Sequence, residues 1–435
     1  MSEKQFFHAV IVGGGMIGHA LINSLAKCSR LKNRSILLLD AVKPKVFEKP
    51  PANFQLRVSA INKNSRKLLQ DLRVWEQVAA LRAHPVRKLE VCESSSHAEI
   101  VLGAEMLGES VAHIVENDLL VGVLAADSVV LDNAAFKYGA KVVQCNTSKS
   151  LEQLATLQLD DDTTISTELV IGADGHNSFV RRSLMDADQY TSWTYPQTAI
   201  VGTVTVDGVD PENSCAFQRF TPMGPLALLP LSPSHSSLSW AVTEPHAEQL
   251  LQLTKPQLVD RINELLWSQM AQQSVVNRAL FAVDAALTAV FRDNSEKVAA
   301  PIVRSIESEL ASFPLGLGLP SRVVAPRVAL VGDAAHRVHP LAGQGANLGF
   351  GDVRQLTEAL DNAARCGADL GSEQYLSAYA DARRLRVAST AAFMDFMQRI
   401  YATDHPLLAA ARALGTTAVH RIPPLKKLVV AVASS

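Results

Sequence analysis

The sequence of 435 residues contains 48% hydrophobic and 19% charged residues, a composition typical of a folded α/β protein and unlike that of a disordered chain. Its length predicts two or three domains, or one large domain with insertions. The formal net charge of −2 gives no electrostatic basis for binding nucleic acid, so we expect no nucleic-acid partner.

The sulfur and imidazole side chains indicate neither a disulfide framework nor a metal site. The five cysteines are scattered, odd in number and never spaced as CxxC, which predicts free thiols in a reducing compartment. His336 and His339 lie three residues apart, but no third ligand of suitable spacing accompanies them, so we expect no metal.

The N-terminal region is apolar but is interrupted by glycine. Residues 6–26 contain no Lys, Arg, Asp or Glu, yet glycines stand in the middle, where they would weaken a membrane-spanning helix. We therefore predict a buried strand followed by a helix. The first residues, MSEKQFF, lack the Arg- and Ser-rich pattern of a transit peptide, so the chain either needs none or has been trimmed.

In chain order, the predicted elements alternate in type. Their hydrophobic periods predict strands at 8–12, 35–40, 168–172 and 327–332, and helices at 16–27, 117–138 and 372–402. Alternation at 197–206 and 236–243 predicts antiparallel strands, whereas the Pro- and Leu-rich segment 222–233 is interpreted as turns and short strands. Because these textures interleave, we expect one domain built from distant segments, with a β-rich domain inserted between them.

A glycine motif follows the first predicted strand. Gly13, Gly15 and Gly18 form a GxGxxG that opens the first helix, where backbone N–H groups can approach a pyrophosphate. Asp40 ends the second strand, where a carboxylate can accept hydrogen bonds from a ribose. The motif predicts a dinucleotide site but does not distinguish FAD from NAD. The alternative is a βα turn without a ligand, with Asp40 as a surface cap.

Two later motifs each follow a predicted strand. The first is GADGHNS at 172–178 with Arg181 after it; the second is GDAAH at 332–336, which continues to Pro340 and to GQGAN at 343–347. In this order and at these separations, the three motifs resemble those of the p-hydroxybenzoate hydroxylase family of flavoprotein monooxygenases. The resemblance covers nearly the whole chain and is greatest to the ubiquinone (coenzyme Q) biosynthesis branch, near the mitochondrial coenzyme Q ring hydroxylases.

The resemblance implies a flavin-binding role for the last motif. The segment from Pro340 through Gly343 and Gly345 to Asn347 would pass over the isoalloxazine ring. The helix that follows would direct its N-terminus at the N1–C2=O edge, where unpaired backbone N–H groups stabilise the anion of reduced flavin.

The resemblance also implies roles for two carboxylates. Asp333, next to Gly332, would bind the ribityl or pyrophosphate part of FAD, and Asp174 with Gly175 matches a motif that serves FAD and NADPH together. Alternatives from the residues alone stay open. An Asp-Gly pair is a common turn, and a helix N-cap is an alternative for Asp333.

Three further positions are interpreted in the same way. Arg57 matches a family arginine near FAD, although a solvated surface base explains it equally well. Asn117 stands where many relatives carry Arg or Gln at the head of a cofactor-contacting helix. Asp40 departs from the more common Glu, but either carboxylate can accept from ribose.

The implied fold class is α/β: a Rossmann-like FAD-binding domain of discontinuous segments, an inserted antiparallel β-sheet substrate domain, and a C-terminal helical region. We place the FAD-binding domain at 1–80, 105–185 and 322–370, the substrate domain at 81–104 and 186–321, and the helical region at 371–435.

The implied activity is that of an FAD-dependent aromatic monooxygenase acting on a polyprenylated phenol or 4-hydroxybenzoate intermediate of ubiquinone biosynthesis. Reduced FAD and O2 would form a C4a-hydroperoxide that transfers one oxygen to the ring. No catalytic base stands out in the sequence. NADPH or a ferredoxin with its reductase would supply electrons.

The resemblance further suggests a ubiquinone-biosynthesis complex and peripheral membrane contact. The expected location is the matrix face of the mitochondrial inner membrane in a eukaryote, and otherwise the cytoplasm in association with a membrane. Two alternatives stay open: a non-catalytic scaffold that binds a prenylated partner, and a related flavin epoxidase or oxidase.

Overall fold

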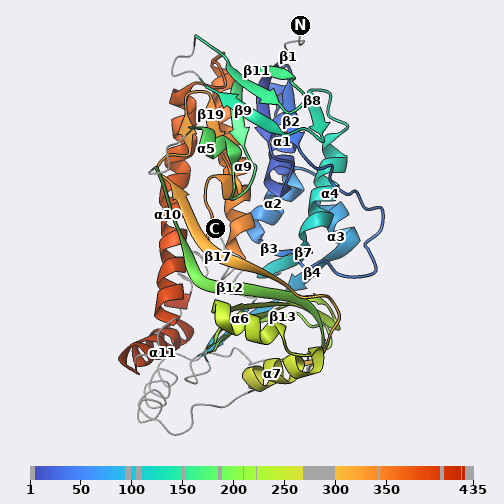
Figure 1. Cartoon of the computed structure of the whole chain (residues 1–435), viewed down its shortest axis with the longest axis vertical. Coiled ribbons are helices and arrows are strands. Elements are labelled where there is room, and N and C mark those ends of the chain that lie inside the picture. Colours follow the sequence, from blue (N-terminus) through green and yellow to red (C-terminus); the bar gives the residue numbers. More distant parts are fainter. Residues whose placement is uncertain are drawn as a thin grey trace.

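The computed structural model is an elongated α/β molecule with one sheet in its upper part and another in its lower part (Figure 1). It describes residues 5–93, 99–103, 110–147, 152–184, 189–208, 210–221, 223–267, 299–339, 343–401, 406–422 and 424–426.

The upper sheet has a parallel centre made from distant parts of the chain. Its strands lie in the order β18-β19-β11-β1-β2-β8, with a β9–β10 hairpin beside the first half of β11. Apolar runs explain why β2, β19 and the second halves of β1 and β11 are buried on both faces, as parallel strands usually are. The strands are β1 (Gln5–Val12), β2 (Ile36–Asp40), β8 (Ala134–Tyr138), β9 (Val142–Asn146), β10 (Ala155–Leu159), β11 (Thr164–Gly172), β18 (Val324–Ala325) and β19 (Val328–Leu330).

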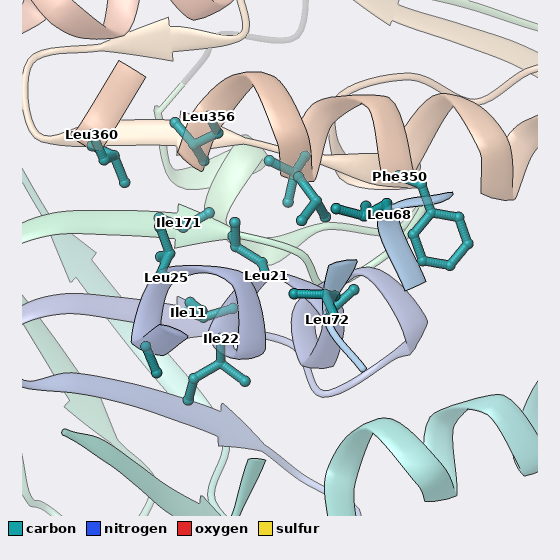
Figure 2. Packing of buried hydrophobic residues seen from close by; sticks show 14 of the residues in the cluster. Ile11, Leu21, Ile22, Leu25, Leu68, Leu72, Ile171, Phe350, Leu356 and Leu360 are labelled. Atoms are coloured by element: carbon teal, nitrogen blue, oxygen red, sulfur yellow. The ribbon is translucent and has the colours of Figure 1, made fainter. Parts of the chain in front are cut away.

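Helices α1 (Met16–Lys27), α4 (Asn117–Ser128) and α9 (Gln344–Arg365) form the layer that covers this sheet. In α1, Leu21 and Leu25 are spaced four apart and point into the same core as Ile11 of β1 (Figure 2). Leu356 and Leu360 of α9 complete that core from the other side (Figure 2). This packing fixes the first turns of α1 and α9 relative to the ends of the strands.

The lower sheet has the order β16-β12-β15-β14-β13-β5-β6, with β17 paired along residues 190–201, the first part of the long strand β12. All of its strand pairs are antiparallel except β13–β5. Helices α6 (Glu244–Leu251) and α7 (Lys255–Trp267) cover one face, where Ile262 of α7 packs in one core with Trp240 and Leu228 of the sheet. The strands are β5 (Lys88–Glu93), β6 (Glu99–Gly103), β12 (Tyr190–Asp207), β13 (Cys215–Thr221), β14 (Gly224–Ser232), β15 (His235–Val242), β16 (Ile302–Ile306) and β17 (Ala311–Pro320).

A small antiparallel sheet lies between the two large ones, in the order β3-β7-β4. Val86 and Ile114 from this sheet pack with Ala216 and Leu231 from the lower sheet. The chain here forms β3 (Val58–Asn62), α2 (Lys63–Asp71), α3 (Trp75–Arg82), β4 (Ala83–Val86) and β7 (Ala112–Glu116).

The C-terminal helix α10 (Glu373–Tyr401) runs along the side of both parts (Figure 1). Its first half packs on α9, and Ala391 in its second half packs with Leu315 and Leu317 of the lower sheet. Helix α11 (Pro406–Arg421) follows. In the part of the chain that the structure describes, no helix is long and apolar enough to cross a bilayer.

The predicted fold class is confirmed, but two local predictions are wrong. The run 117–138 is not one helix: α4 ends at Ser128, and residues 134–138 form β8, which is held by parallel pairing with β2. The segment 222–233 is not a set of turns and short strands, because β14 is one nine-residue strand paired on both sides. The proposed domain boundaries stay a prediction.

Candidate functional site

Three loops that carry the sequence motifs meet at one edge of the upper sheet, which we call the motif edge. The first loop (13–15) joins β1 to α1, the second (173–178) joins β11 to α5, and the third (331–339 and 343) lies between β19 and α9. Strands β1, β2, β11 and β19 are parallel neighbours, so their carboxyl ends lie at the same edge, where open α/β sheets bind ligands. The backbone confirms the contact: Ala173 N donates to Val12 O at 2.8 Å, and Val331 N donates to Gly172 O at 2.9 Å. The structure thus brings the three motifs together.

The first loop leaves room and free donors at the start of α1. Gly15 is the N-cap of α1, which has no side-chain cap and no acid in its first turn. A Cβ added at Gly15 would meet nothing within 4 Å, whereas one at Gly18 would lie 1.9 Å from Gly13 O. Gly18 is therefore needed for packing of the turn, and Gly15 leaves open space beside the helix amides, the kind of site that binds a pyrophosphate.

Asp40 is oriented by this turn. Its Oδ2 accepts a hydrogen bond from Gly14 N, and its Oδ1 accepts one from Val42 N at 2.6 Å. The carboxylate is half-buried at the end of β2, where it can also accept from the hydroxyls of a ribose. The position agrees with the sequence prediction, and the ribose contact itself stays a prediction.

The second loop is held by Asp174, which caps the short helix α5 (Phe179–Leu184). Its Oδ2 accepts from Phe179 N at 2.6 Å and Val180 N at 3.1 Å. Its Oδ1 is buried and has no hydrogen-bond partner among the described residues. Asp174 is thus a turn and cap residue, and it retains one oxygen that could accept from a ligand. Gly175 follows with φ +79° and open space beside it.

Arg181 joins the second loop to the third. Its guanidinium donates to Ala334 O at 2.8 Å and to His176 O at 2.6 Å. It also lies 4.0 Å from the centre of the Tyr190 ring, a cation–π contact with the start of β12. The sequence motif includes this arginine, and the structure shows that it positions both loops.

The third loop places a free carboxylate and a second uncapped helix at the same edge. Asp333, in the turn Gly332–Ala334, is exposed, and no hydrogen bond holds its side chain within the described part of the chain. It is not a side-chain cap. Gly343 is the N-cap of α9 with φ +60°, and α9 has no side-chain cap and no acid in its first turn. Gly345 faces open space. Pro340 lies outside the described residues.

Asn347 is fully hydrogen-bonded inside the protein. Its Oδ1 accepts from Asn62 N at 3.1 Å and Ser65 Oγ at 2.8 Å, and its Nδ2 donates to Ala60 O at 2.9 Å and Gly343 O at 3.1 Å. In this structure the amide therefore joins α9 to β3 and α2. Its predicted cofactor contact is supported only through the loop that it holds.

Arg57 and Asn117 lie together, where the start of β3 meets the start of α4. Asn117 N donates to Arg57 O at 2.9 Å, and Asn117 Oδ1 accepts from Ser59 Oγ at 2.7 Å. Arg57 is exposed, as the surface-base alternative requires. Burial, the charge of Arg337 and, less strongly, the charges of Arg181 and Arg57 lower the pKa of His176 in the second loop.

A buried histidine borders the third loop. His339 is 1% exposed, its Nε2 lies 3.4 Å from Gln197 Oε1, and its ring packs edge-on against Tyr195 at 5.1 Å. Burial lowers its pKa to about 4, so it is neutral near pH 7. His336 instead pairs with Asp352. The two histidines thus have separate partners, and the absence of a metal stays a prediction.

One other group of possible metal ligands occurs among the described residues. Ligand atoms of Glu90, Cys92 and Glu99 lie within 4.8 Å of one another on β5 and β6. Burial and the neighbouring carboxylates raise the pKa of the Cys92 thiol to about 12, which disfavours the thiolate that a metal requires. This group lies on the lower sheet and is not part of the motif edge.

Sequence reasoning missed Asp352, which is 0% exposed in α9 and bonds to the third loop. It stands 20 residues after Gly332, and only the folded helix brings it back to the turn. An acid inside an apolar helical pattern is the one signal that could have identified it.

Two uncapped helix N-termini, the Asp40 carboxylate and the buried Asp174 Oδ1 at one sheet edge are the arrangement of a dinucleotide-binding α/β fold. The family described as FAD binding domain matches residues 7–300 and 301–394. The fold is shared with a probable FAD-dependent monooxygenase, PqsL, from Pseudomonas aeruginosa (TM-score 0.72, 18% identity, 95% of this chain and 99% of that one). It is also shared with p-nitrophenol 4-monooxygenase PnpA from Pseudomonas putida (TM-score 0.73, 14% identity, 100% and 99%).

Similarity to curated sequences is higher. The mitochondrial ubiquinone biosynthesis monooxygenase COQ6 of Caenorhabditis elegans is 40% identical over 98% of this chain and 95% of its own length. The human protein of that name is 35% identical over 100% and 93%. The chain therefore belongs to the FAD-dependent monooxygenase family, in its ubiquinone biosynthesis branch, and the resemblance expected from the motifs is confirmed.

Proposed function

We propose that this protein binds FAD at the motif edge and hydroxylates the aromatic ring of a polyprenylated phenol or 4-hydroxybenzoate intermediate of ubiquinone biosynthesis. The observation that carries the proposal is similarity over nearly the full length of both chains to monooxygenases named for that pathway. When bound, FAD supplies the reduction of O2 and the delivery of one oxygen atom to the ring.

The residues at the motif edge have defined tasks in this proposal. The amides at Gly15 would hold the pyrophosphate, Asp40 the ribose, and Asp333 the ribityl chain. The N-terminus of α9 at Gly345 would face the electron-rich edge of the flavin, where its partial positive charge stabilises the reduced form. Asp174 would accept one further hydrogen bond through its orphaned Oδ1.

The lower sheet would form the wall of the substrate site opposite the flavin. Its long strand β12 reaches from Tyr190, beside Arg181, to the sheet that α6 and α7 cover. Tyr195 and Gln197 of β12 contact His339, so this strand meets the third loop directly. A ring bound beside this contact would be shielded from water, which this type of oxygen transfer requires.

Electron supply, partners and location belong to the proposal as well. NADPH, or a ferredoxin with its reductase, would reduce the flavin. The mitochondrial names of the relatives support a location in the mitochondria of a eukaryotic host. The matrix face of the inner membrane and contact with a ubiquinone-biosynthesis complex are the finer part of the proposal. The scaffold alternative is not favoured, since the relatives are named monooxygenases and the flavin motifs are intact.

The test is reconstitution with FAD followed by anaerobic reduction, monitored by the visible flavin spectrum. NADPH and a ferredoxin–reductase pair are each added with and without a polyprenylated 4-hydroxybenzoate in detergent. Admission of isotopically labelled O2 should then place one labelled oxygen atom on the ring, detected by mass spectrometry. Failure to bind FAD would sink the proposal, and reduction without ring labelling would redirect it to a flavin oxidase or epoxidase.

A further inference from the structure

The buried carboxylate of Asp352 in α9 contacts the third loop at two residues. Asp352 Oδ2 accepts from Gly332 N at 2.8 Å and lies 2.7 Å from His336 Nε2, and Asp352 Oδ1 accepts from Arg383 Nε at 2.7 Å. The Asp352 side chain is 0% exposed and that of His336 is 2% exposed. Both ends of the turn that carries Asp333 are therefore fixed to one carboxylate.

Helix α10 contacts the Asp352 carboxylate through Arg383. Arg383 Nη2 donates to Leu348 O at 2.8 Å, and its guanidinium fills the space above Gly351, where an added Cβ would come within 2.8 Å of it. One turn earlier, Tyr379 OH donates to Leu330 O at 2.8 Å, at the end of β19. The C-terminal helix thus contacts the turn through Arg383 and its preceding strand through Tyr379.

The network keeps the carboxylate charged. Burial alone would raise the pKa of Asp352, but His336, Arg383 and the Gly332 amide together outweigh it and hold that pKa below its usual range. A charged acceptor binds a backbone N–H more strongly than a neutral one does. It therefore holds the Gly332 peptide in its left-handed conformation, at φ +59°. The orientation of that peptide sets the direction of the next side chain, Asp333.

We infer that Asp352 is a positioning residue for FAD: with Arg383, it holds the Gly332–Ala334 turn so that the exposed Asp333 carboxylate points at the ribityl chain. The inference rests on the proposed FAD site and deepens it, because it assigns part of FAD affinity to α10. Neither residue needs to touch the cofactor. The competing explanation is that this is only a buried ion pair that stabilises the fold.

A matched control separates these explanations. Glu93 and Arg412 form another buried ion pair at 2.5 Å, with side chains 2% and 7% exposed, between the lower sheet and α11. Asp352→Asn and Glu93→Gln therefore each neutralise one buried carboxylate that faces an arginine. Both are expected to lower the melting temperature of the FAD-free protein. Only Asp352→Asn acts on the turn of the FAD site.

The experiment is titration of each full-length FAD-free variant with FAD, read by quenching of flavin fluorescence and by the visible spectrum of the bound flavin. Asp352→Asn should weaken FAD binding by about tenfold to a hundredfold, the range expected for loss of a charged hydrogen bond. Glu93→Gln should bind FAD within about twofold of the unmodified protein. Arg383→Lys, which keeps the charge beside Asp352, should retain more affinity than Arg383→Leu does.

Three results would overturn the inference. The first is unchanged FAD affinity in folded Asp352→Asn, and the second is equal weakening by Glu93→Gln. If Asp352→Asn does not fold, the Arg383 pair decides, and equal affinity of Arg383→Lys and Arg383→Leu counts against the inference. If the unmodified protein binds no FAD, the proposed function itself fails, which is a distinguishable outcome.

Discussion

At the scale of single residues, His19 shows how a buried imidazole can limit stability in acid. It is 0% exposed in α1, stacks on Phe136 at 6.4 Å, and lies 6.2 Å from the Tyr138 ring. Neither ring nitrogen has a hydrogen-bond partner within the described part of the chain. Burial lowers the pKa of His19 to about 4, whereas its ordinary value is 6.5.

The sign of the pH effect follows from these two values. Above pH 6.5 the histidine is neutral in both the folded and the unfolded state, so its folded-state contribution is fully present. As the pH falls from 6.5 towards 4, the unfolded chain binds a proton that the folded state excludes, and the free energy of unfolding decreases. The total loss is up to about 3 kcal/mol.

We therefore expect His19→Phe, which keeps the ring stack but cannot bind a proton, to lose less stability between pH 7 and pH 5 than the unmodified protein does. Urea unfolding at a series of pH values measures this difference. His339 titrates in the same range and remains in both proteins, so a smaller decrease persists in the variant. An equal decrease in both proteins would show that burial does not lower the pKa of His19 in the folded protein.

At the scale of elements, two glycines of the β1–α1 turn allow packing of the turn and ligand binding to be tested separately. Gly18→Ala would place a Cβ 1.9 Å from Gly13 O, so the turn has to open, and we expect loss of both stability and FAD binding. Gly15→Ala meets no atom within 4 Å and has φ −74°, which alanine adopts freely. Its melting temperature without FAD should be nearly unchanged.

The prediction for Gly15→Ala is about tenfold weaker FAD binding, because the methyl group occupies the space where the pyrophosphate approaches the helix amides. Thermal melts with and without FAD measure both quantities. A variant that binds FAD normally would place the pyrophosphate elsewhere and would remove the main support for the site.

The sequence alone predicts the elements that are determined by neighbouring residues, and not those that depend on tertiary contacts. The glycine turn, α1 and β2 follow from hydrophobic period and glycine spacing alone, and the motifs gave the loops that meet at the sheet edge. Strand β8 could not be found in this way, since its pairing with β2 is a tertiary contact between residues about 100 positions apart. The same holds for Asp352, whose partners Gly332 and Arg383 lie 20 and 31 residues away.

At the scale of the whole molecule, α10 connects the two large sheets. With 29 residues it extends about 40 Å. Arg383 and Tyr379 fix its first half to the FAD side. In its second half, Asp395 accepts a hydrogen bond from Tyr195 OH at 3.0 Å, and Ala391 packs into the lower sheet. A helix attached at both ends should make the two parts unfold together.

This connection is tested by a pair of adjacent substitutions. Ala391 is 2% exposed, so Ala391→Asp buries a charge and should cost about 3 kcal/mol, whereas Ala392→Asp, on the exposed face, should change stability by less than about 0.5 kcal/mol. The measurement uses a Trp75→Phe background, in which the three remaining tryptophans lie in β12, β15 and α7. Because α10 transmits the damage to Arg383, we expect flavin release and tryptophan fluorescence to shift together to a lower temperature in Ala391→Asp. A shift of the tryptophan signal alone would mean that the sheets unfold independently, and α10 would then only cover them.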